Sequence, residues 1–305
     1  MENIRLTKFR NMIKRFINTK NISKADVVLI SAPYEKGTTF HGGTATGPTK
    51  IVECLNSQLD WFDRKLKVEP VDFIKTAHVN LKKIKNLSPQ KTLEVIHENC
   101  ENILKKKKFI FLLGGEHSVS IGYFQALAKK YNPKDVTILQ IDAHCDLRKD
   151  DSDYMQHPSN LSHCTVMRHA SEMGYPLVQV GVRTFFKDEY EYIKNKKNNV
   201  TVFPWGKKIP TINQILREIK TKYLYLSIDV DGFDPAHMPA TGTPLAGGLE
   251  WWYGVELIEK AINKKELVGA DIVEVSPIRD SVLTEYGAAQ LCYTIIANKF
   301  KNKFK

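Results

Sequence analysis

Acidic and imidazole side chains are concentrated in three short segments of the sequence. In an extended backbone, side chains two positions apart lie on the same face, so alternating polar residues in such a segment point the same way. One such motif alone is more typical of a strand end or a turn, but three in one chain indicate a shared site. The segments are GGEHS with His117, DAHCD with Asp142, His144 and Asp146, and SIDVD with Asp229 and Asp231.

These six side chains have the chemistry of a metal centre. Four carboxylates and two imidazoles that converge would repel one another strongly unless cations neutralised them. The set contains no thiolate and is too small for two separate closed cages, so we expect two ions that share bridging carboxylates and a bridging solvent. Manganese suits this mixture of oxygen and nitrogen ligands. The sequence therefore predicts two Mn²⁺ ions per chain.

Each of the three segments follows an apolar run rich in Val, Ile and Leu, as does a fourth polar segment, Glu274 to Pro277. Most runs lack strict alternation, which is typical of parallel strands buried on both faces. The pattern predicts an α/β fold whose strands bring these polar segments to one edge of the sheet. The predicted strands are Val27–Ser31, Phe109–Leu113, Val136–Ile141, Leu177–Val182, Val200–Phe203, Tyr223–Ile228 and Val268–Val275.

Lysine-rich amphipathic stretches of helical length lie between several of these runs. The sequence shows no internal repeat, low-complexity linker or break in composition, so we expect a single domain over residues 1–305, with residues 1–20 as a loosely attached N-terminal helix. The predicted helices are Pro89–Leu104, Ser120–Lys130, Asp188–Lys194, Ile212–Lys220 and Gly254–Asn263, with the N-terminal helix around Leu6–Asn18.

The composition excludes several classes of protein. Apolar residues make up 42% and charged residues 26%, which is typical of a globular chain. The five cysteines are scattered without a CxxC pair, so a disulfide framework or zinc finger is not expected. The formal charge of +11 comes mostly from dispersed lysines without a nucleic-acid motif, so we expect no nucleic-acid partner. No apolar run could span a bilayer and the start lacks a secretory signal, so we expect a cytoplasmic protein without a membrane partner.

The motifs resemble those of the ureohydrolases, the arginase and agmatinase family. GGEHS, DAHCD and SIDVDGFDP are highly specific for this family in combination. The resemblance extends from about Pro33 to Leu291 and includes GGTATGP, PATGTPLAGG and VEVSP. It implies the arginase-like fold, a three-layer α/β/α domain around a mostly parallel sheet. Family members usually assemble as trimers or hexamers, so a homotrimer or homohexamer is expected.

The resemblance also implies how the metal ligands are divided between the two ions. Asp142 and Asp229 would each bind both ions and so bridge them. One manganese ion would be held by His117, Asp142, Asp146 and Asp229, and the other by Asp142, His144, Asp229 and Asp231.

The activity implied by the resemblance is the release of urea from a guanidinium group. The guanidinium carbon is a poor electrophile, whereas a metal-bound water can lose its proton near neutral pH and attack it. The amine must then be protonated in order to leave. His163, in LSHCTVMR, lies where the family has its proton-shuttling histidine, and Glu274 would accept the paired N–H donors of the guanidinium. The alternatives are an ordinary loop histidine and a buried carboxylate that caps a loop.

The loop after DAHCD favours agmatine as the substrate. Arginases have small polar residues here that hold the α-groups of arginine, whereas this chain has LRKDD at 147–151. DLR followed by SHCTVMR, and the segment GVRTFFKDEYEY, resemble agmatinases. Arg148 could pair with a carboxylate, so agmatine would prefer Arg148 turned away. We therefore expect a small cationic guanidino substrate, agmatine, with putrescine and urea as products. Arginase, guanidinobutyrase, guanidinopropionase and formiminoglutamase are alternatives within the family, and a metal-dependent deacetylase is a remote one.

Overall fold

The computed structural model describes residues 15–304. Its centre is an eight-stranded sheet with the strand order β2-β1-β3-β8-β7-β4-β5-β6, and every pairing between neighbouring strands is parallel. The strands are β1 (Val27–Ala32), β2 (Thr76–Asn80), β3 (Phe109–Gly114), β4 (Val136–Ile141), β5 (Leu177–Val180), β6 (Val200–Phe203), β7 (Tyr223–Asp229) and β8 (Glu266–Val273).

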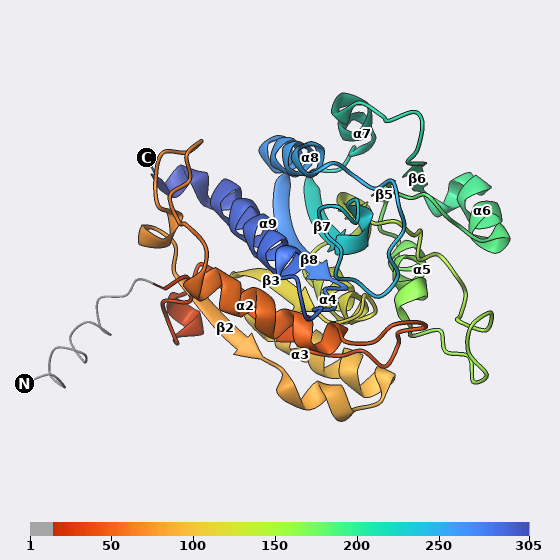
Figure 1. Cartoon of the computed structure of the whole chain (residues 1–305), viewed down its shortest axis with the longest axis horizontal. Helices are drawn as coiled ribbons and strands as arrows, with labels where there is room; N and C mark the ends of the chain where they lie inside the picture. The colour runs from red at the N-terminus through yellow and green to blue at the C-terminus, as the bar shows by residue number, and fades with distance from the viewer. Residues whose placement is uncertain (1–14, 305) are drawn as a thin grey trace, which may run out of the picture.

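Helices cover both faces of the sheet, so the chain forms three layers (Figure 1). Buried strand side chains alternate between two hydrophobic cores: Leu139 and Ile141 belong to one, and Val136 and Ile138 to the other. The first core includes side chains of α2 (Gly47–Ser57), α7 (Ile212–Glu218), α8 (Trp251–Lys264) and α9 (Leu283–Phe300). The second includes side chains of α3 (Pro89–Lys105), α4 (Val119–Ala128) and α5 (Val166–Glu172), and α6 (Lys187–Lys194) packs against it. The predicted α/β/α fold is confirmed.

The predicted strands and helices within the described residues are present with nearly the bounds expected. The strand predicted at Val268–Val275 is displaced and spans Glu266–Val273. It ends there because Glu274 adopts a left-handed backbone, with φ 64°, which a strand cannot continue. β2, α2, α5 and α9 were not predicted from the sequence.

The helix predicted around Leu6–Asn18 lies mostly outside the described residues, and residues 15–18 contain no helix. Within residues 15–304, no helix has both the length and the apolar composition needed to cross a membrane.

Candidate metal centre and active site

The polar segments predicted to carry the chemistry follow the four central strands of the sheet. β3, β8, β7 and β4 are neighbours in this order, and because they are parallel their carboxyl ends lie at one edge. The loop after β7 comes very close to the start of the loop after β4. A Cβ atom on Gly232 would lie 2.5 Å from the backbone nitrogen of Asp142, so only glycine allows this approach.

The polar segments do not have the extended backbone expected from their alternating pattern. β4 ends at Ile141, before DAHCD begins, and β7 is followed at once by a short 3-10 helix, Val230–Gly232. Asp146 has a left-handed backbone with φ 54°. The side chains lie close together because these loops turn back over the sheet edge, and not because they share one face of an extended segment.

His117 is oriented by a chain of hydrogen bonds that begins in the sheet. Ser227 donates its hydroxyl proton to Asp271 at 2.9 Å, so the His117 ring donates Nε2–H to Ser227 Oγ, also at 2.9 Å. Asp271 is buried and accepts further hydrogen bonds from Ser120 and Tyr225. The chain leaves Nδ1 of His117 as the nitrogen that faces the acidic side chains.

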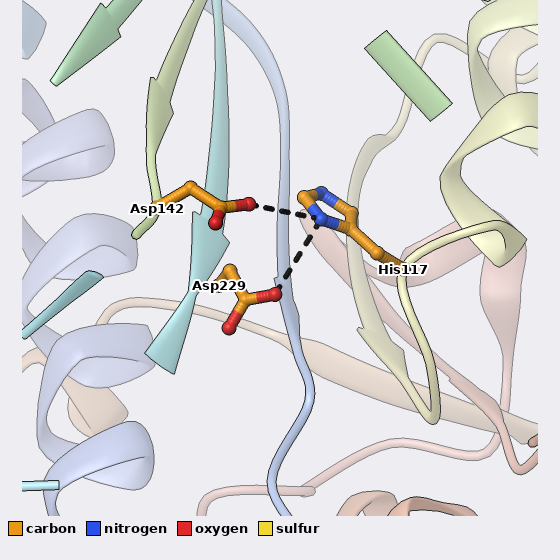
Figure 2. A group of neighbouring side chains, drawn as sticks. All are labelled: His117, Asp142 and Asp229. Atoms are coloured by element: carbon orange, nitrogen blue, oxygen red, sulfur yellow. Dashed lines mark ion pairs between the residues drawn. The ribbon is translucent and has the colours of Figure 1, made fainter. Parts of the chain in front are cut away.

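Three carboxylates lie around this Nδ1 atom. The nitrogen is 3.0 Å from an oxygen of Asp146, 3.3 Å from Asp142 and 3.6 Å from Asp229. Figure 2 shows Asp142 and Asp229 pointing at the ring of His117, which approaches from the opposite side. Nδ1 is buried and has no hydrogen-bond partner among the described residues. A buried imidazole nitrogen without a partner, surrounded by carboxylate oxygens, fits a metal ligand.

A second group of possible ligands shares Asp142 with the first. Oδ1 of Asp142 lies 3.5 Å from Nδ1 of His144, and Oδ2 of Asp231 lies 3.2 Å from the same nitrogen. Ligand atoms of Asp142, His144 and Asp231 lie within 4.8 Å of one another, as do those of His117, Asp142 and Asp229. Asp142 is therefore placed between the two groups. Asp229 belongs to the first group, and its Oδ1 accepts the N–H of Asp231, so a bridging role for Asp229 stays a prediction.

The carboxylates of this cluster disturb one another's ionisation. Burial, and then the charge of Asp142, raises the pKa of Asp146 to about 7. Burial, and then the charges of Asp231 and Asp142, raises the pKa of Asp229 well above its usual range. Divalent cations between these groups would remove the repulsion and favour the ionised forms. The donor set of carboxylate oxygens and imidazole nitrogens fits the two Mn²⁺ ions expected from the sequence.

His163 and Glu274 lie beside the cluster and contact each other. Nδ1 of His163 is 3.3 Å from Oε1 of Glu274, and this oxygen also accepts the backbone N–H of His117 at 2.9 Å. Nε2 of His163 is 2.8 Å from the hydroxyl of Thr39. Burial lowers the pKa of His163, but the hydrogen bond to Glu274 and the charges of Glu274, Glu116 and Asp146 together outweigh burial and raise this pKa to about 9. Oε2 of Glu274 is buried and has no hydrogen-bond partner in the described part of the chain.

A cavity of about 260 Å³ opens onto the cluster. Arg148 lies in its wall, but its guanidinium is already engaged: it donates to Asp153 at 2.5 Å and to the Tyr154 hydroxyl at 2.9 Å. The cavity walls combine groups of the cluster with hydroxyls and aromatic rings. They include Thr39, His144, Asp146, Arg148, Tyr154, His163, Cys164, Thr184, Phe185, Phe186, Glu189, Asp229 and Thr243.

Comparison with known proteins decides the family. The model of the arginase family matches residues 25–297. The chain belongs to the arginase family. Ureohydrolases of this family include an N(1)-aminopropylagmatine ureohydrolase of Synechocystis, which is 31% identical to this chain over 300 residues, covering 95% of each. An agmatinase of Bacillus subtilis is 34% identical over 266 residues, covering 84% of this chain and 86% of the relative.

A solved structure supports the same assignment. The agmatine ureohydrolase of Thermoplasma volcanium superimposes with a TM-score of 0.80 at 25% identity, covering 97% of this chain and 98% of that chain. The ureohydrolase prediction and the arginase-like fold are thus confirmed. The chain is an agmatinase-like hydrolase that acts on guanidino C–N bonds.

Several residues of this ureohydrolase site were not predicted. Thr39 reaches His163 from 124 positions away in the sequence, and nothing local marks it. Asp271 could have been predicted from the sequence. A carboxylate within the apolar run LVGADIV must be buried and therefore hydrogen-bonded. Cys145, which lies within the DAHCD segment, packs in the second hydrophobic core. Cys164, the residue after His163, lines the cavity.

Proposed function

We propose that this ureohydrolase binds two Mn²⁺ ions at the carboxylate cluster and hydrolyses agmatine to putrescine and urea. The choice of agmatine as substrate rests on the ion pair between Arg148 and Asp153. Among the described residues that line the cavity, Arg148 is the only lysine or arginine. Its guanidinium is already paired with the carboxylate of Asp153. A substrate with an α-carboxylate would therefore lose water without gaining a free cationic partner.

The metal ligands in this proposal are the six residues predicted from the sequence. When bound, the Mn²⁺ pair would act as a Lewis acid that makes water nucleophilic near neutral pH. Ser227 and Asp271 fix the ring of His117 so that Nδ1 points at the carboxylates before any ion binds. The proposed ligands are His117, Asp142, Asp146 and Asp229 on one side, and Asp142, His144, Asp229 and Asp231 on the other.

In this proposal, Glu274 binds the guanidinium of the substrate and His163 donates a proton to the leaving amine. The unpartnered Oε2 of Glu274 is available to accept a guanidinium N–H, which would hold the substrate carbon next to the cluster. The pKa of His163 is raised to about 9, so its imidazole keeps a proton at neutral pH. That proton would pass to the departing amine, because an unprotonated amine is a very poor leaving group.

N(1)-aminopropylagmatine is a second candidate substrate. A relative that is 31% identical over 95% of the chain is an N(1)-aminopropylagmatine ureohydrolase. This compound has the same guanidinium end as agmatine and a longer cationic tail, so the same catalytic residues would serve both. Tyr154, Phe185 and Phe186 line the cavity and are partly exposed, so they offer aromatic faces to such a tail.

Urea release from four compounds under saturating Mn²⁺ tests the proposal. The compounds are agmatine, N(1)-aminopropylagmatine, arginine and 4-guanidinobutyrate. We expect kcat/KM for one of the two carboxylate-free amines to exceed that of both guanidino acids by about 100-fold or more, because an unpaired buried carboxylate costs several kcal/mol. If arginine or 4-guanidinobutyrate matches the amines, the substrate assignment fails while the ureohydrolase assignment stands.

A further inference from the structure

Resting on the proposed function, we propose that Asp153 is a specificity-determining residue, which excludes guanidino acids by occupying the guanidinium of Arg148. Both residues lie in the loop between β4 and α5, and the cavity wall includes Arg148. With Asp153 in place, the wall offers a neutral ion pair. Without Asp153, the same wall would offer a buried cation suited to a carboxylate.

Arg148 is built into the wall as a fixed group. Its side chain is 4% exposed, and its guanidinium lies 3.2 Å from the ring centre of Phe186 and 4.5 Å from that of Tyr154. The two rings are in edge contact with each other, with their centres 5.9 Å apart. A guanidinium held by aromatic faces on a cavity wall is a strong receptor for a carboxylate, because little side-chain freedom is left to lose on binding.

Asp153 already supplies that carboxylate. Oδ2 of Asp153 lies 2.5 Å from Nη1 of Arg148, while the Asp153 side chain itself is 55% exposed. The buried partner is therefore the cation, and the acid reaches it from the solvent side of the loop. An exposed acid is an internal competitor for any external carboxylate, and it can be removed without opening a hole in the protein core.

Among the described residues that line the cavity, Arg148 is the only lysine or arginine. Glu189, also in the cavity wall, holds the backbone N–H groups of Leu147 and Phe186 with its two oxygens. These bonds tie the residue before Arg148 to the turn before α6, from which Phe186 contacts the guanidinium of Arg148. With Arg148 paired to Asp153, its guanidinium offers no free charge to the carboxylate of a guanidino acid, whereas a guanidino amine has no carboxylate that needs such a partner.

The test compares Asp153→Asn with a matched control, Asp150→Asn. Asp150 lies in the same loop, but its carboxylate accepts the backbone N–H of Ser152. Loss of the Asp153 charge frees the guanidinium of Arg148 for a new carboxylate partner, so in Asp153→Asn the ratio of kcat/KM for agmatine over 4-guanidinobutyrate should fall about 10-fold or more. The ratio should stay at the parental value in Asp150→Asn.

A double variant and a binding measurement test whether the change in specificity comes from the freed guanidinium of Arg148. Adding Arg148→Met to Asp153→Asn should abolish the gain with 4-guanidinobutyrate, because the receiving cation is gone. Binding of 4-guanidinobutyrate measured by calorimetry should be about 10-fold tighter in Asp153→Asn than in the parent, and this readout needs no turnover. If the parent releases no urea from any guanidino compound, the proposed function fails, and the calorimetry still decides the role of Asp153. Equal binding by a correctly folded Asp153→Asn variant and the parent would overturn the inference.

Discussion

Nδ1 of His163 lies 3.3 Å from Oε1 of Glu274, the residue at which β8 gives way to the loop. The same oxygen accepts the backbone N–H of His117. Glu274 therefore joins the proposed proton donor to a proposed metal ligand, and its hydrogen bond and charge contribute most to raising the pKa of this imidazole against the effect of burial. The other oxygen of Glu274 remains available for a guanidinium. In the proposed mechanism, this one carboxylate aligns the acid, the substrate and the metal site.

Replacing His163 by alanine should lower kcat by about 100-fold or more while metal content stays at the parental level, as expected for loss of a general acid. The pKa of His163 is raised to about 9, so the protonated form is present at neutral pH and is lost as the pH rises through that value. Parental kcat should accordingly fall above about pH 9. Turnover by His163→Ala equal to the parent across the pH range would show that another group protonates the amine.

Ser227→Ala should weaken Mn²⁺ binding by about 10- to 100-fold, because it removes the acceptor that orients the His117 ring. Calorimetric titration of metal-free protein with Mn²⁺ gives the affinity. Ser120→Ala is the matched control, since Ser120 donates to the other oxygen of Asp271 and not to His117. Equal losses in both variants would mean that the effect comes from Asp271 and the sheet, not from the orientation of His117.

Cys145→Ser should keep urea release while lowering stability. The thiol lies fully buried among apolar side chains, and a hydroxyl placed there costs about 1–3 kcal/mol. Cys164→Ser should be nearly neutral, because Cys164 lies 3.3 Å from the hydroxyl of Ser162 and a serine can keep that contact. Denaturation curves and urea assays check both. Loss of Mn²⁺ by a folded Cys145→Ser variant would contradict its placement away from the metal site.

The parts of the fold that could be predicted are those with a local signal. The apolar runs of β3, β4 and β7 end in polar residues, and parallel pairing alone brings their ends together. α9 was missed because buried side chains lie on most of its circumference, so its sequence lacks a clear helical period. β2 was missed because TAHVN, at the edge of the sheet, is short and largely polar.

The supporting contacts of the site could not be predicted from spacing. The sequence placed Arg148 near the site but left open which way it would point. Its direction depends on Asp153 and Tyr154, and on Phe186 arriving from the turn before α6. Such contacts depend on how separate loops approach one another in space. Unlike the burial of a helix or strand face, they leave no periodic pattern in a single sequence.

Titration of metal-free protein with Mn²⁺, while urea release from agmatine is followed, tests whether the centre is binuclear and whether it hydrolyses agmatine. The shared position of Asp142 between two ligand groups predicts a binuclear centre. Urea release should therefore rise with added Mn²⁺ and reach its plateau at two ions per chain. A plateau at one ion per chain, or no urea from agmatine at any Mn²⁺ concentration, would contradict the account.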